Sequence, residues 1–375
     1  MIINRLSVFN YKNIGQVEIE CSPKTNCFFG NNGMGKTNLL DAIHYLSFCK
    51  SHTHTIDSQI IRKGEDLCVV QGFYDIEDKQ EEIFCAIRRG QSKQFKRNKK
   101  EYGKLSEHIG LLPLVMVSPS DSDLIRGGSD ERRRFMDMII SQHDKQYLNS
   151  LIQYNRALMQ RNSLLRKHCM DKSLYEALEI QMDGYGTQIH EKRKILIDEM
   201  LGVFDEYYKF ICGSRETVGL KYVSQLEEGS IEKSLNALRD KDMAVGYTTF
   251  GTHKDDIEMT LDGNLMRRVG SQGQNKTFLV ALKLAQFSFV SQKSNRKPTL
   301  LLDDIFDKFD ADRVERIILL VSGNRFGQIF ITDTNRKYLD QILEAIGQDY
   351  SLFKVEQGEV QLLENKTANY AAKKL

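Results

Sequence analysis

The sequence predicts an α/β protein, with a nucleotide-binding lobe built on a mixed sheet and a second lobe that is mainly helical. Three observations predict it. A glycine-rich loop at 30–37 stands between a short apolar run and a helical apolar repeat. A continuous apolar run at 299–302 ends in two carboxylates, as expected of a buried parallel strand. Between these segments, leucines repeat at seven-residue spacing, which is typical of paired long helices.

The glycine-rich loop has the P-loop pattern G-x-x-x-x-G-K-T, preceded by the strand-like run Cys27–Phe29. Glycines let backbone N–H groups face phosphate oxygens, and a helix beginning near Lys36 directs the positive end of its dipole at them. We expect Lys36 to reach the β- and γ-phosphates of ATP and the Thr37 hydroxyl to bind Mg²⁺. The expected ATP-binding residues here are Gly30, Asn31, Asn32, Gly33, Met34, Gly35, Lys36, Thr37 and Asn38.

Length and composition favour a protein with two lobes, since 375 residues exceed one small core. The net charge is 53 − 51 = +2, so composition alone does not require a nucleic-acid partner. None of the seven cysteines forms a C-x-x-C pair, and we expect reduced thiols in a cytoplasmic protein. Met1–Leu6 does not resemble a signal peptide, and no apolar run approaches the ~20 residues of a membrane span. We therefore expect no membrane association.

Strand patterns at 2–20 predict an N-terminal sheet that pairs ahead of the P-loop strand. The polar loop that follows the P-loop helix carries His52 and His54. A solvated loop is favoured over a metal site there, because no acidic or cysteine partner lies nearby.

A basic run follows the strand patterns at 67–89. Eight cations lie between Arg88 and Lys104, with Phe95 and Tyr102 interleaved. This composition is typical of a surface that contacts DNA phosphates, but a solvated hairpin with a basic face explains it equally well. The candidate DNA contacts are Arg88, Arg89, Lys96, Arg97, Lys99 and Lys100; Arg132–Arg134 and the helical arm described next are further candidates.

The middle of the chain predicts an antiparallel helical hairpin, an arm that projects from its lobe. Leu151, Leu158 and Leu165 repeat at seven-residue spacing, and a turn is expected at 168–172. A capping box, S-x-x-E at Ser173–Glu176, predicts the start of the second helix. Gly184 and Gly186 cost ~1 kcal/mol each inside that helix and can kink it. A plain helical core is the alternative to an arm.

Two further segments carry chemistry. The segment Ser271-Gln272-Gly273-Gln274 opens a helix, so its amides and the Ser271 hydroxyl form a second phosphate-binding end. The strand at 299–302 ends in Asp303 and Asp304, the Walker B pattern. Asp303 is expected to hold Mg²⁺, and Asp304 to orient or deprotonate the attacking water. The second phosphate-binding set is Ser271, Gln272, Gly273 and Gln274.

The spacing of these segments predicts a dimer. Ser271 lies 303 − 271 = 32 residues before Asp303, a gap filled by one helix and its connection. A helix of about 20 residues is ~30 Å long, so Gly273 is expected to lie far from the carboxylates of its own chain. It could instead complete the P-loop of a second copy. ATP would then favour the dimer, and hydrolysis would remove the contact.

We expect four segments along the chain. Residues 1–118 and 296–375 form the ATPase lobe, 119–245 the helical insertion with the arm, and 246–295 the segment with the second phosphate-binding end. The chain is expected to end in a hairpin around Gln357–Gly358 and a frayed tail from residue 364.

These motifs resemble those of the ABC-type ATPases and, within them, the bacterial RecF family, over nearly the whole chain. The Ser-Gln-Gly-Gln form of the signature is specific for this family over transporter ATPases, which usually carry Leu-Ser-Gly-Gly-Gln. The segments that carry the resemblance are Gly30–Asn38, Pro119–Asp137, Gly251–Asp256, Ser271–Thr277 and Leu300–Asp310.

The resemblance implies an ABC-type head related to Rad50 and SMC heads, and a DNA-binding repair and recombination protein with weak ATPase activity. Relatives act at gapped DNA or single-strand/double-strand junctions and, with RecO and RecR, help to load RecA. From the spacing of the motifs, we expect an ATP-dependent homodimer that dissociates upon hydrolysis.

The chain departs from the family pattern at four places. The Ser51–Thr53 loop lacks an arginine, and Thr252 and Lys254 replace proline and arginine. Asp304 is one methylene shorter than the usual glutamate, and Thr332–Asp333 stands where many ABC ATPases place a histidine. These departures are compatible with ATP binding and count against rapid hydrolysis.

Two other functions are compatible with part of the motif pattern. An SMC- or Rad50-like structural or defence ATPase, without recombinase loading, is the alternative. A membrane-transporter ATPase subunit is disfavoured, because it would lack the helical insertion at 119–245 and would usually carry the missing histidine.

Overall fold

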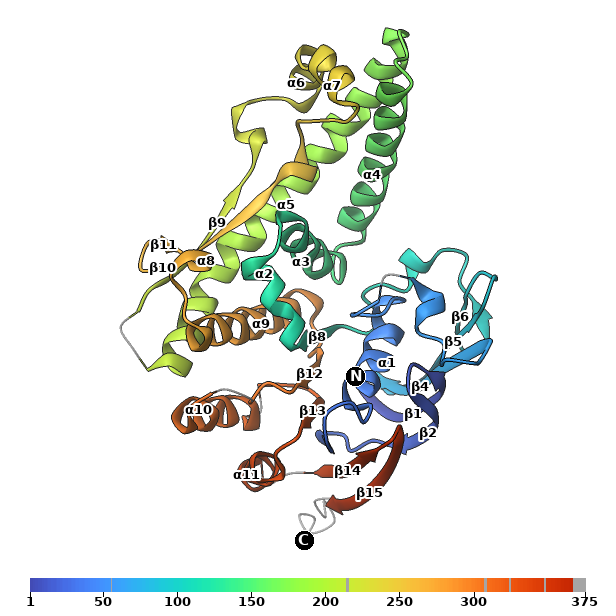
Figure 1. The fold of residues 1–375 in the computed structure, drawn as a ribbon, viewed down its shortest axis with the longest axis vertical. Helices are drawn as coiled ribbons and strands as arrows, with labels where there is room; N and C mark the ends of the chain where they lie inside the picture. The colour runs from blue at the N-terminus through green and yellow to red at the C-terminus, as the bar shows by residue number, and fades with distance from the viewer. Residues whose placement is uncertain (55, 214–215, 307–308, 324, 347–348, 367–375) are drawn as a thin grey trace. The chain divides into compact units, whose positions relative to one another are not determined.

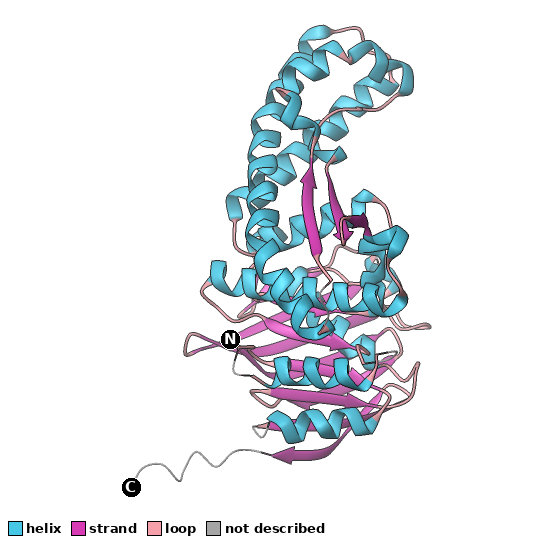
Figure 2. Ribbon diagram, turned by 90° about the vertical axis from the view of Figure 1, so that its left-hand side faces the viewer, coloured by secondary structure: helices cyan, strands magenta, loops and turns pink. Residues whose placement is uncertain are grey.

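The fold is described from a computed structural model, which contains two compact units. Unit 1 comprises Met1–Asp121 and Val290–Leu375, and unit 2 comprises Ser122–Phe289. Strands dominate unit 1 and helices dominate unit 2 (Figure 2). The predicted α/β class with a helical second unit is confirmed, and the division of 119–295 at residue 245 remains a prediction. The structure describes residues 1–54, 56–213, 216–306, 309–323, 325–346 and 349–366.

The N-terminal sheet of unit 1 is antiparallel and six-stranded. Buried and less buried side chains alternate along its strands, because one face packs on the core and the other faces outward. The period-2 patterns at 2–20 and 67–89 are therefore confirmed as strands. Its strand order is β2 (Ile14–Glu20), β1 (Ile2–Tyr11), β4 (Leu67–Ile76), β5 (Lys79–Arg88), β6 (Gln94–Arg97) and β7 (Lys100–Glu101).

The second sheet of unit 1 is mixed and carries the P-loop strand. Its order is β15 (Glu359–Lys366), β14 (Tyr350–Glu356), β3 (Thr25–Phe29), β13 (Ile329–Asp333), β12 (Thr299–Asp303) and β8 (Leu114–Val117). The strands from β14 to β8 run parallel, and β15 pairs antiparallel with β14. Strands β8, β12 and β13 are wholly buried, which explains their continuous apolar runs.

The end of the chain differs from the prediction. The hairpin turn at Gln357–Gly358 is present, with both residues at positive φ. The tail does not fray from residue 364, because β15 continues its pairing with β14 to Lys366. Residues 367–375 lie outside the described residues.

The P-loop helix α1 (Lys36–Phe48) lies between the two sheets. It packs against β1, β4 and β5 of the first sheet and against β8, β12 and β13 of the second. Eleven of its 13 residues are buried, as expected of a helix that is apolar on most sides. This burial fixes the start of α1, and hence the P-loop, to the core of unit 1. The outer helices are α10 (Ala311–Ser322) and α11 (Arg336–Ile346), of which α11 packs on β3 and β13.

Unit 2 is built around an antiparallel pair of long helices, α4 (Lys145–Arg166) and α5 (Lys172–Cys212), which lie side by side in Figure 1. The predicted helical hairpin is confirmed, but the predicted capping box is wrong. The side chain of Asp171, not Ser173, caps α5, accepting a hydrogen bond from the Ser173 N–H at 3.0 Å.

The other helices of unit 2 are α2 (Asp123–Arg126), α3 (Ser129–Ser141), α6 (Ile231–Ala237), α7 (Arg239–Val245), α8 (Met266–Val269) and α9 (Gln272–Ser294), which ends in unit 1. A three-stranded sheet, β11 (Asn264–Leu265), β10 (Asp256–Leu261) and β9 (Val218–Val223), completes the unit.

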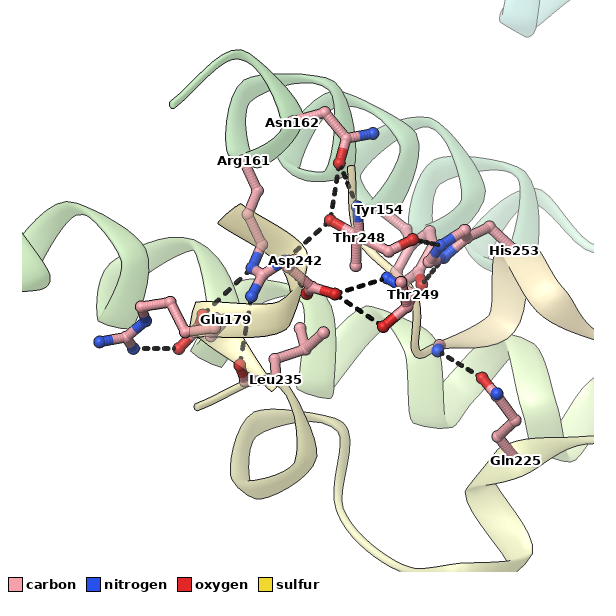
Figure 3. A network of polar contacts seen from close by, with 12 residues as sticks. Tyr154, Arg161, Asn162, Glu179, Gln225, Leu235, Asp242, Thr248, Thr249 and His253 are labelled. Atoms are coloured by element: carbon pink, nitrogen blue, oxygen red, sulfur yellow. Dashed lines mark hydrogen bonds and ion pairs between the residues drawn. The ribbon is translucent and has the colours of Figure 1, made fainter. Parts of the chain in front are cut away.

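A buried arginine holds the helical pair to the segment that follows it (Figure 3). Arg161 of α4 has no exposed surface. Its guanidinium donates to Glu179 of α5 at 3.1 Å and to Asp242 of α7 at 2.6 Å. It also donates to the Thr248 hydroxyl at 2.9 Å and the Leu235 carbonyl at 3.2 Å. One charged side chain therefore connects four segments of unit 2, with its hydrogen-bonding groups engaged by a fully buried set of acceptors.

Two of the three glycines of α5, Gly184 and Gly186, predict opposite effects of the same substitution. The helix continues through both without a break. A Cβ at Gly184 would meet nothing within 4 Å, whereas one at Gly186 would lie 2.2 Å from Ile231 Cδ1 and 3.2 Å from the Tyr154 ring. Gly184→Ala is expected to stabilise unit 2 by ~0.5–1 kcal/mol. Gly186→Ala is expected to destabilise it by ~1–3 kcal/mol through overpacking. Urea unfolding followed by circular dichroism measures both, and equal effects would contradict this assignment.

Candidate functional site

The P-loop connects β3 to α1 within unit 1. Gly35 stands at the N-terminus of α1 with φ of 113°, and Gly33 has φ of 80°, conformations that favour glycine. A Cβ at Gly30 would lie 2.2 Å from the Val355 carbonyl oxygen of β14, so that position also requires glycine. Because Gly35 has no side chain to cap α1, the amides at this helix start can receive an anion.

Lys36 curls back over the loop that precedes it. Its ammonium donates to the carbonyls of Gly30 at 2.7 Å and Asn31 at 2.9 Å. Burial lowers the pKa of Lys36, and the nearby carboxylates of Asp304 and Asp303 oppose that shift. The ammonium is thus held inside the loop, where exchange of carbonyl for phosphate oxygens is a short movement.

The Walker B carboxylates lie beside the P-loop. The Thr37 hydroxyl donates to Asp303 Oδ1 at 2.9 Å, and the Thr332 hydroxyl donates to the same oxygen at 2.7 Å. The parallel register of β12 and β13 pairs Asp303 with Thr332 and so builds this contact. Burial raises the pKa of Asp303, and the two hydroxyl donors oppose the shift.

Asp304, at the same place, is strained and half-buried. Its φ is 48°, a left-handed conformation that a non-glycine residue adopts at a cost of ~1–3 kcal/mol and that often marks functional sites. Its backbone N–H donates to the Thr332 carbonyl at 3.1 Å and to the Thr332 hydroxyl at 3.0 Å. Its Oδ1 is buried and has no hydrogen-bond partner among the described residues. A carboxylate oxygen in this position is suited to a cation or a water molecule.

A pocket of about 170 Å³ joins these groups. It is lined by Asn32, Gly33, Gly35, Lys36, Thr37, Asn38, Asp303 and Asp304, all from the predicted set. Its oxygen donors, one hydroxyl and two carboxylates, are the hard ligands that suit Mg²⁺ together with phosphate oxygens. The unpartnered Asp304 oxygen and the uncapped helix start make the pocket fit for ATP with Mg²⁺. Among the described residues, no group of three or more His, Cys, Asp or Glu side chains is placed to hold a metal ion.

Asp333 adds a third carboxylate that the sequence patterns did not assign to the site. It ends β13 beside the P-loop strand, paired in register with Phe29. It is 2% exposed, and its Oδ2 has no hydrogen-bond partner among the described residues. Burial raises its pKa to about 6, and the charge on Asp304 adds to that shift. The sequence signals were its position at the end of a buried strand and its place where many ABC ATPases have a histidine.

The raised pKa predicts a pH-dependent stability. The folded protein holds this proton more tightly than the unfolded chain does, so ionising Asp333 disfavours the folded state. The penalty appears as pH rises above the unfolded pKa of 3.8 and is complete above about 6. Relative to Asp333→Asn, the wild type should lose ~2–3 kcal/mol of unfolding free energy between pH 4 and pH 7. Parallel unfolding of both proteins across this range measures it, and a constant difference would contradict the assignment.

Two further residues border the P-loop without any pattern that reveals them. Asn13, in the turn between β1 and β2, donates to the Gly33 carbonyl at 3.1 Å and accepts from Asn38 at 2.7 Å. Lys12 forms an ion pair of 2.6 Å with Asp41, which is fully buried in α1. Both line a wider pocket of about 640 Å³ that includes Gly33 and Asn38. The site thus extends from the P-loop to the β1–β2 turn.

The signature residues lie in unit 2, at the start of α9. Ser271 is exposed, and its hydroxyl accepts the Gln274 N–H at 3.2 Å. The Gln274 side chain in turn accepts the Ser271 N–H at 2.9 Å. This reciprocal pair is a capping box of the Ser-x-x-Gln type. It fixes the geometry of Gln272 and Gly273 between them.

The basic run forms the hairpin β5–β6–β7, and several of its cations hold the fold. Arg97 makes two hydrogen bonds to Glu81, at 2.8 and 2.6 Å. Lys96 lies over the Phe84 ring at 5.8 Å. Phe95 is 1% exposed, so this aromatic residue belongs to the core and cannot stack on a base. Arg89 donates to the Glu65 carbonyl at 2.9 Å, and the exposed candidates are Arg88, Arg89, Lys99 and Lys100.

The arginines at 132–134 are also used within unit 2. Arg132 is buried and forms a two-point ion pair with Asp256, at 2.5 and 3.0 Å. Arg133 donates to the Asp255 carbonyl at 2.8 Å, and Arg134 pairs with Glu131. The first two connect α3 to the segment 251–256.

A P-loop beside two carboxylates of a parallel sheet, with a helical insertion ahead of a Ser-Gln-Gly-Gln helix start, defines an ABC-type ATPase head. A model of the RecF/RecN/SMC N terminal domain family matches residues 2–361. The chain belongs to this family and, within it, to the RecF proteins. Within the described residues, no helix combines the length and apolar character needed to cross a membrane.

Relatives of known name match nearly the whole length of the chain. The DNA replication and repair protein RecF of Parabacteroides distasonis is 68% identical over 364 residues, 97% of this chain and 100% of the relative. That of Bacteroides thetaiotaomicron is 55% identical over 362 residues, 96% and 98%. A solved structure of the recombination mediator protein RecF with ATP, of the RecFOR pathway, has a TM-score of 0.87 at 26% identity, covering 97% and 98%. An Smc head domain from Pyrococcus furiosus, with a TM-score of 0.59 at 16% identity over 99% and 98%, is alike in fold alone.

Proposed function

We propose that this RecF-family ATPase binds DNA as an ATP-dependent homodimer, in which each nucleotide is held between the P-loop of one copy and the signature of the other. The observation that carries the proposal is the split of phosphate-binding groups between two units. Unit 1 holds the P-loop and the Walker B carboxylates in one pocket. Unit 2 holds an exposed serine at a helix start, in the form expected of a second phosphate contact.

In the P-loop pocket, the chain's own residues would bind and orient the triphosphate of ATP. Backbone amides between Gly33 and Thr37 would donate to phosphate oxygens, and Lys36 would exchange its two carbonyl partners for them. Thr37 and Asp303 would hold Mg²⁺, which neutralises developing phosphate charge when bound. Asp304 would accept a hydrogen bond from the attacking water and take its proton.

Hydrolysis is proposed to be weak and to dissociate the dimer. Asp304 has a shorter side chain than glutamate, and its backbone N–H is bonded to Thr332, so the reach of its carboxylate toward a water molecule is limited. Thr332–Asp333 supplies a hydroxyl that already donates to Asp303 and a buried carboxyl group with a raised pKa. Because the one O–H of Thr332 is already used, neither residue offers the free N–H donor that an imidazole would supply. Loss of the γ-phosphate would remove the shared contact and release the two copies.

The chain is proposed to act in the cytoplasm on gapped DNA or single-strand/double-strand junctions, with RecO and RecR, in support of RecA loading. The names of its relatives support replication and repair, and the solved neighbour of the RecFOR pathway supports the two partners. An SMC- or Rad50-like structural or defence ATPase, without recombinase loading, is the alternative. Retention of RecO and RecR on the immobilised protein with gapped DNA and ATP would separate the two functions.

Ser271→Ala tests the proposal. The variant should bind ATP with the affinity of the wild type, because Ser271 lies outside the P-loop pocket. It should lose ATP-dependent dimerisation in sedimentation velocity, since the shared phosphate contact is removed. Ser173→Ala, at the exposed start of another helix of unit 2, is the matched control and should dimerise normally. Normal dimerisation of Ser271→Ala would refute the shared site.

A further inference from the structure

A carboxylate in the segment between the long helix α5 and β9 holds the first turn of the signature helix α9. The Gln274 side-chain amide donates to Glu216 Oε1 at 2.8 Å. The same Gln274 side chain accepts the Ser271 N–H at 2.9 Å through its other end. Glu216 therefore acts on Ser271 through one intervening side chain, and both ends of that side chain are engaged.

Glu216 is itself held from the other side by the last turn of α5. Its second oxygen accepts the Tyr208 hydroxyl at 2.7 Å and the Cys212 thiol at 3.2 Å. Tyr208 is fully buried. Its ring and that of Phe204 lie 6.3 and 4.7 Å from the ring of Phe278 in α9. The Glu216 carboxylate thus lies at the contact between α5 and α9, where aromatic residues of the two helices pack together.

The hydrogen bonds at this contact between α5 and α9 favour one orientation of the signature residues Gln274 and Ser271. A hydrogen bond to an ionised acceptor is stronger than one between neutral groups, so Glu216 selects one rotamer of Gln274. Gln274 then fixes the exposed Ser271 at the helix start through two hydrogen bonds. Without Glu216, the Gln274 side chain would regain rotamer freedom, and presenting Ser271 to a ligand would require ordering it again.

We propose that Glu216 is a positioning residue for ATP-dependent dimerisation, orienting Gln274 and through it Ser271 for contact with the nucleotide held by a second copy. This inference rests on the proposed function, because it assumes that Ser271 meets ATP across the dimer. Glu216 is not among the residues that line the P-loop pocket, so its substitution is aimed at the signature half of the site.

The test compares Glu216→Ala with Glu216→Gln in sedimentation velocity over a range of ATP concentrations. The alanine variant should need about tenfold more ATP to reach half-maximal dimerisation, the effect of losing one hydrogen bond to a charged group. The glutamine variant keeps a carbonyl acceptor for Gln274 and should stay within about threefold of the wild type. ATP affinity of the isolated copy should be unchanged in both.

Mixing two variants shows whether Glu216→Ala loses the position of its signature or loses its fold. Glu216→Ala mixed with Lys36→Ala places an intact P-loop of one chain against an intact signature of the other. ATP turnover of the mixture should exceed the sum of the two separate variants. A Glu216→Ala protein that had simply lost its fold would gain nothing from mixing, and that result would overturn the inference.

Ser271→Ala in the same sedimentation experiment distinguishes a failure of the Glu216 inference from a failure of the shared nucleotide site. If Ser271→Ala does not dimerise and Glu216→Ala dimerises at the wild-type ATP concentration, the role of Glu216 is refuted and the shared site stands. If both variants dimerise normally, the shared site itself is refuted. Tyr208→Phe keeps the ring and removes one hydrogen-bond donor to Glu216. It should raise the ATP concentration at half-maximal dimerisation about threefold. An unchanged concentration would count against the claim that Tyr208 holds Glu216 in place.

Discussion

Replacing Lys36 with alanine is expected to weaken ATP binding by at least about 100-fold, and with it to abolish ATP-dependent dimerisation. The Lys36 ammonium is the cation that the P-loop encloses, held by the Gly30 and Asn31 carbonyls in the same pocket as Thr37. Its two hydrogen bonds would pass to phosphate oxygens, and each such charge-assisted bond contributes ~1.5–3 kcal/mol. Fluorescent ATP-analogue titration measures the loss.

The matched control for Lys36→Ala is Lys79→Ala, which removes an exposed lysine from the first residue of β5 in the same unit. It should bind ATP as the wild type does. Lys36→Ala should keep its fold by circular dichroism. ATP affinity within threefold of the wild type would show that the P-loop pocket is not where ATP binds.

Arg161→Ala is expected to destabilise unit 2 by ~3–5 kcal/mol. The guanidinium is fully buried and balances Glu179 and Asp242, which are 1% and 0% exposed. Its removal leaves two carboxylates in the interior, of which Arg239 reaches Glu179 at 2.7 Å. Asp242 would then retain hydroxyl and backbone donors without a cation. Urea unfolding with hydrogen exchange in α4 and α5 measures the loss.

Two variants sharpen the Arg161 experiment. Arg134→Ala removes an exposed arginine paired with Glu131 and should change stability by less than ~1 kcal/mol. Arg161→Met keeps most of the packed volume without the charge, and it should be nearly as destabilising as alanine. A mild effect of Arg161→Met would show that packing, rather than the ion pairs, holds the helical pair to α7.

Much of the fold could be predicted from local patterns. Strands β8, β12 and β13 could be predicted from continuous apolar runs, because both of their faces are covered. The helical pair was visible from its leucine repeat. The start of α5 was misplaced, because Ser173–Glu176 and Asp171 are competing caps and the sequence does not rank them.

The candidate site was predictable where a single segment carries it and hidden where distant segments meet. The P-loop and Asp303–Asp304 follow from spacing. Asn13 and Glu216 act through contacts with residues 20 and 58 positions away, and no periodicity encodes such contacts. Likewise, burial of Phe95 and the use of Arg97 by Glu81 depend on sheet pairing, which a count of charges cannot show.

The most direct test of the shared nucleotide is ATP turnover per chain as a function of protein concentration, with sedimentation of the same samples. The account predicts that turnover per chain rises with concentration, in step with a species of twice the mass of one chain that forms only with ATP. Turnover that is full and constant while the protein sediments as a single chain would contradict it.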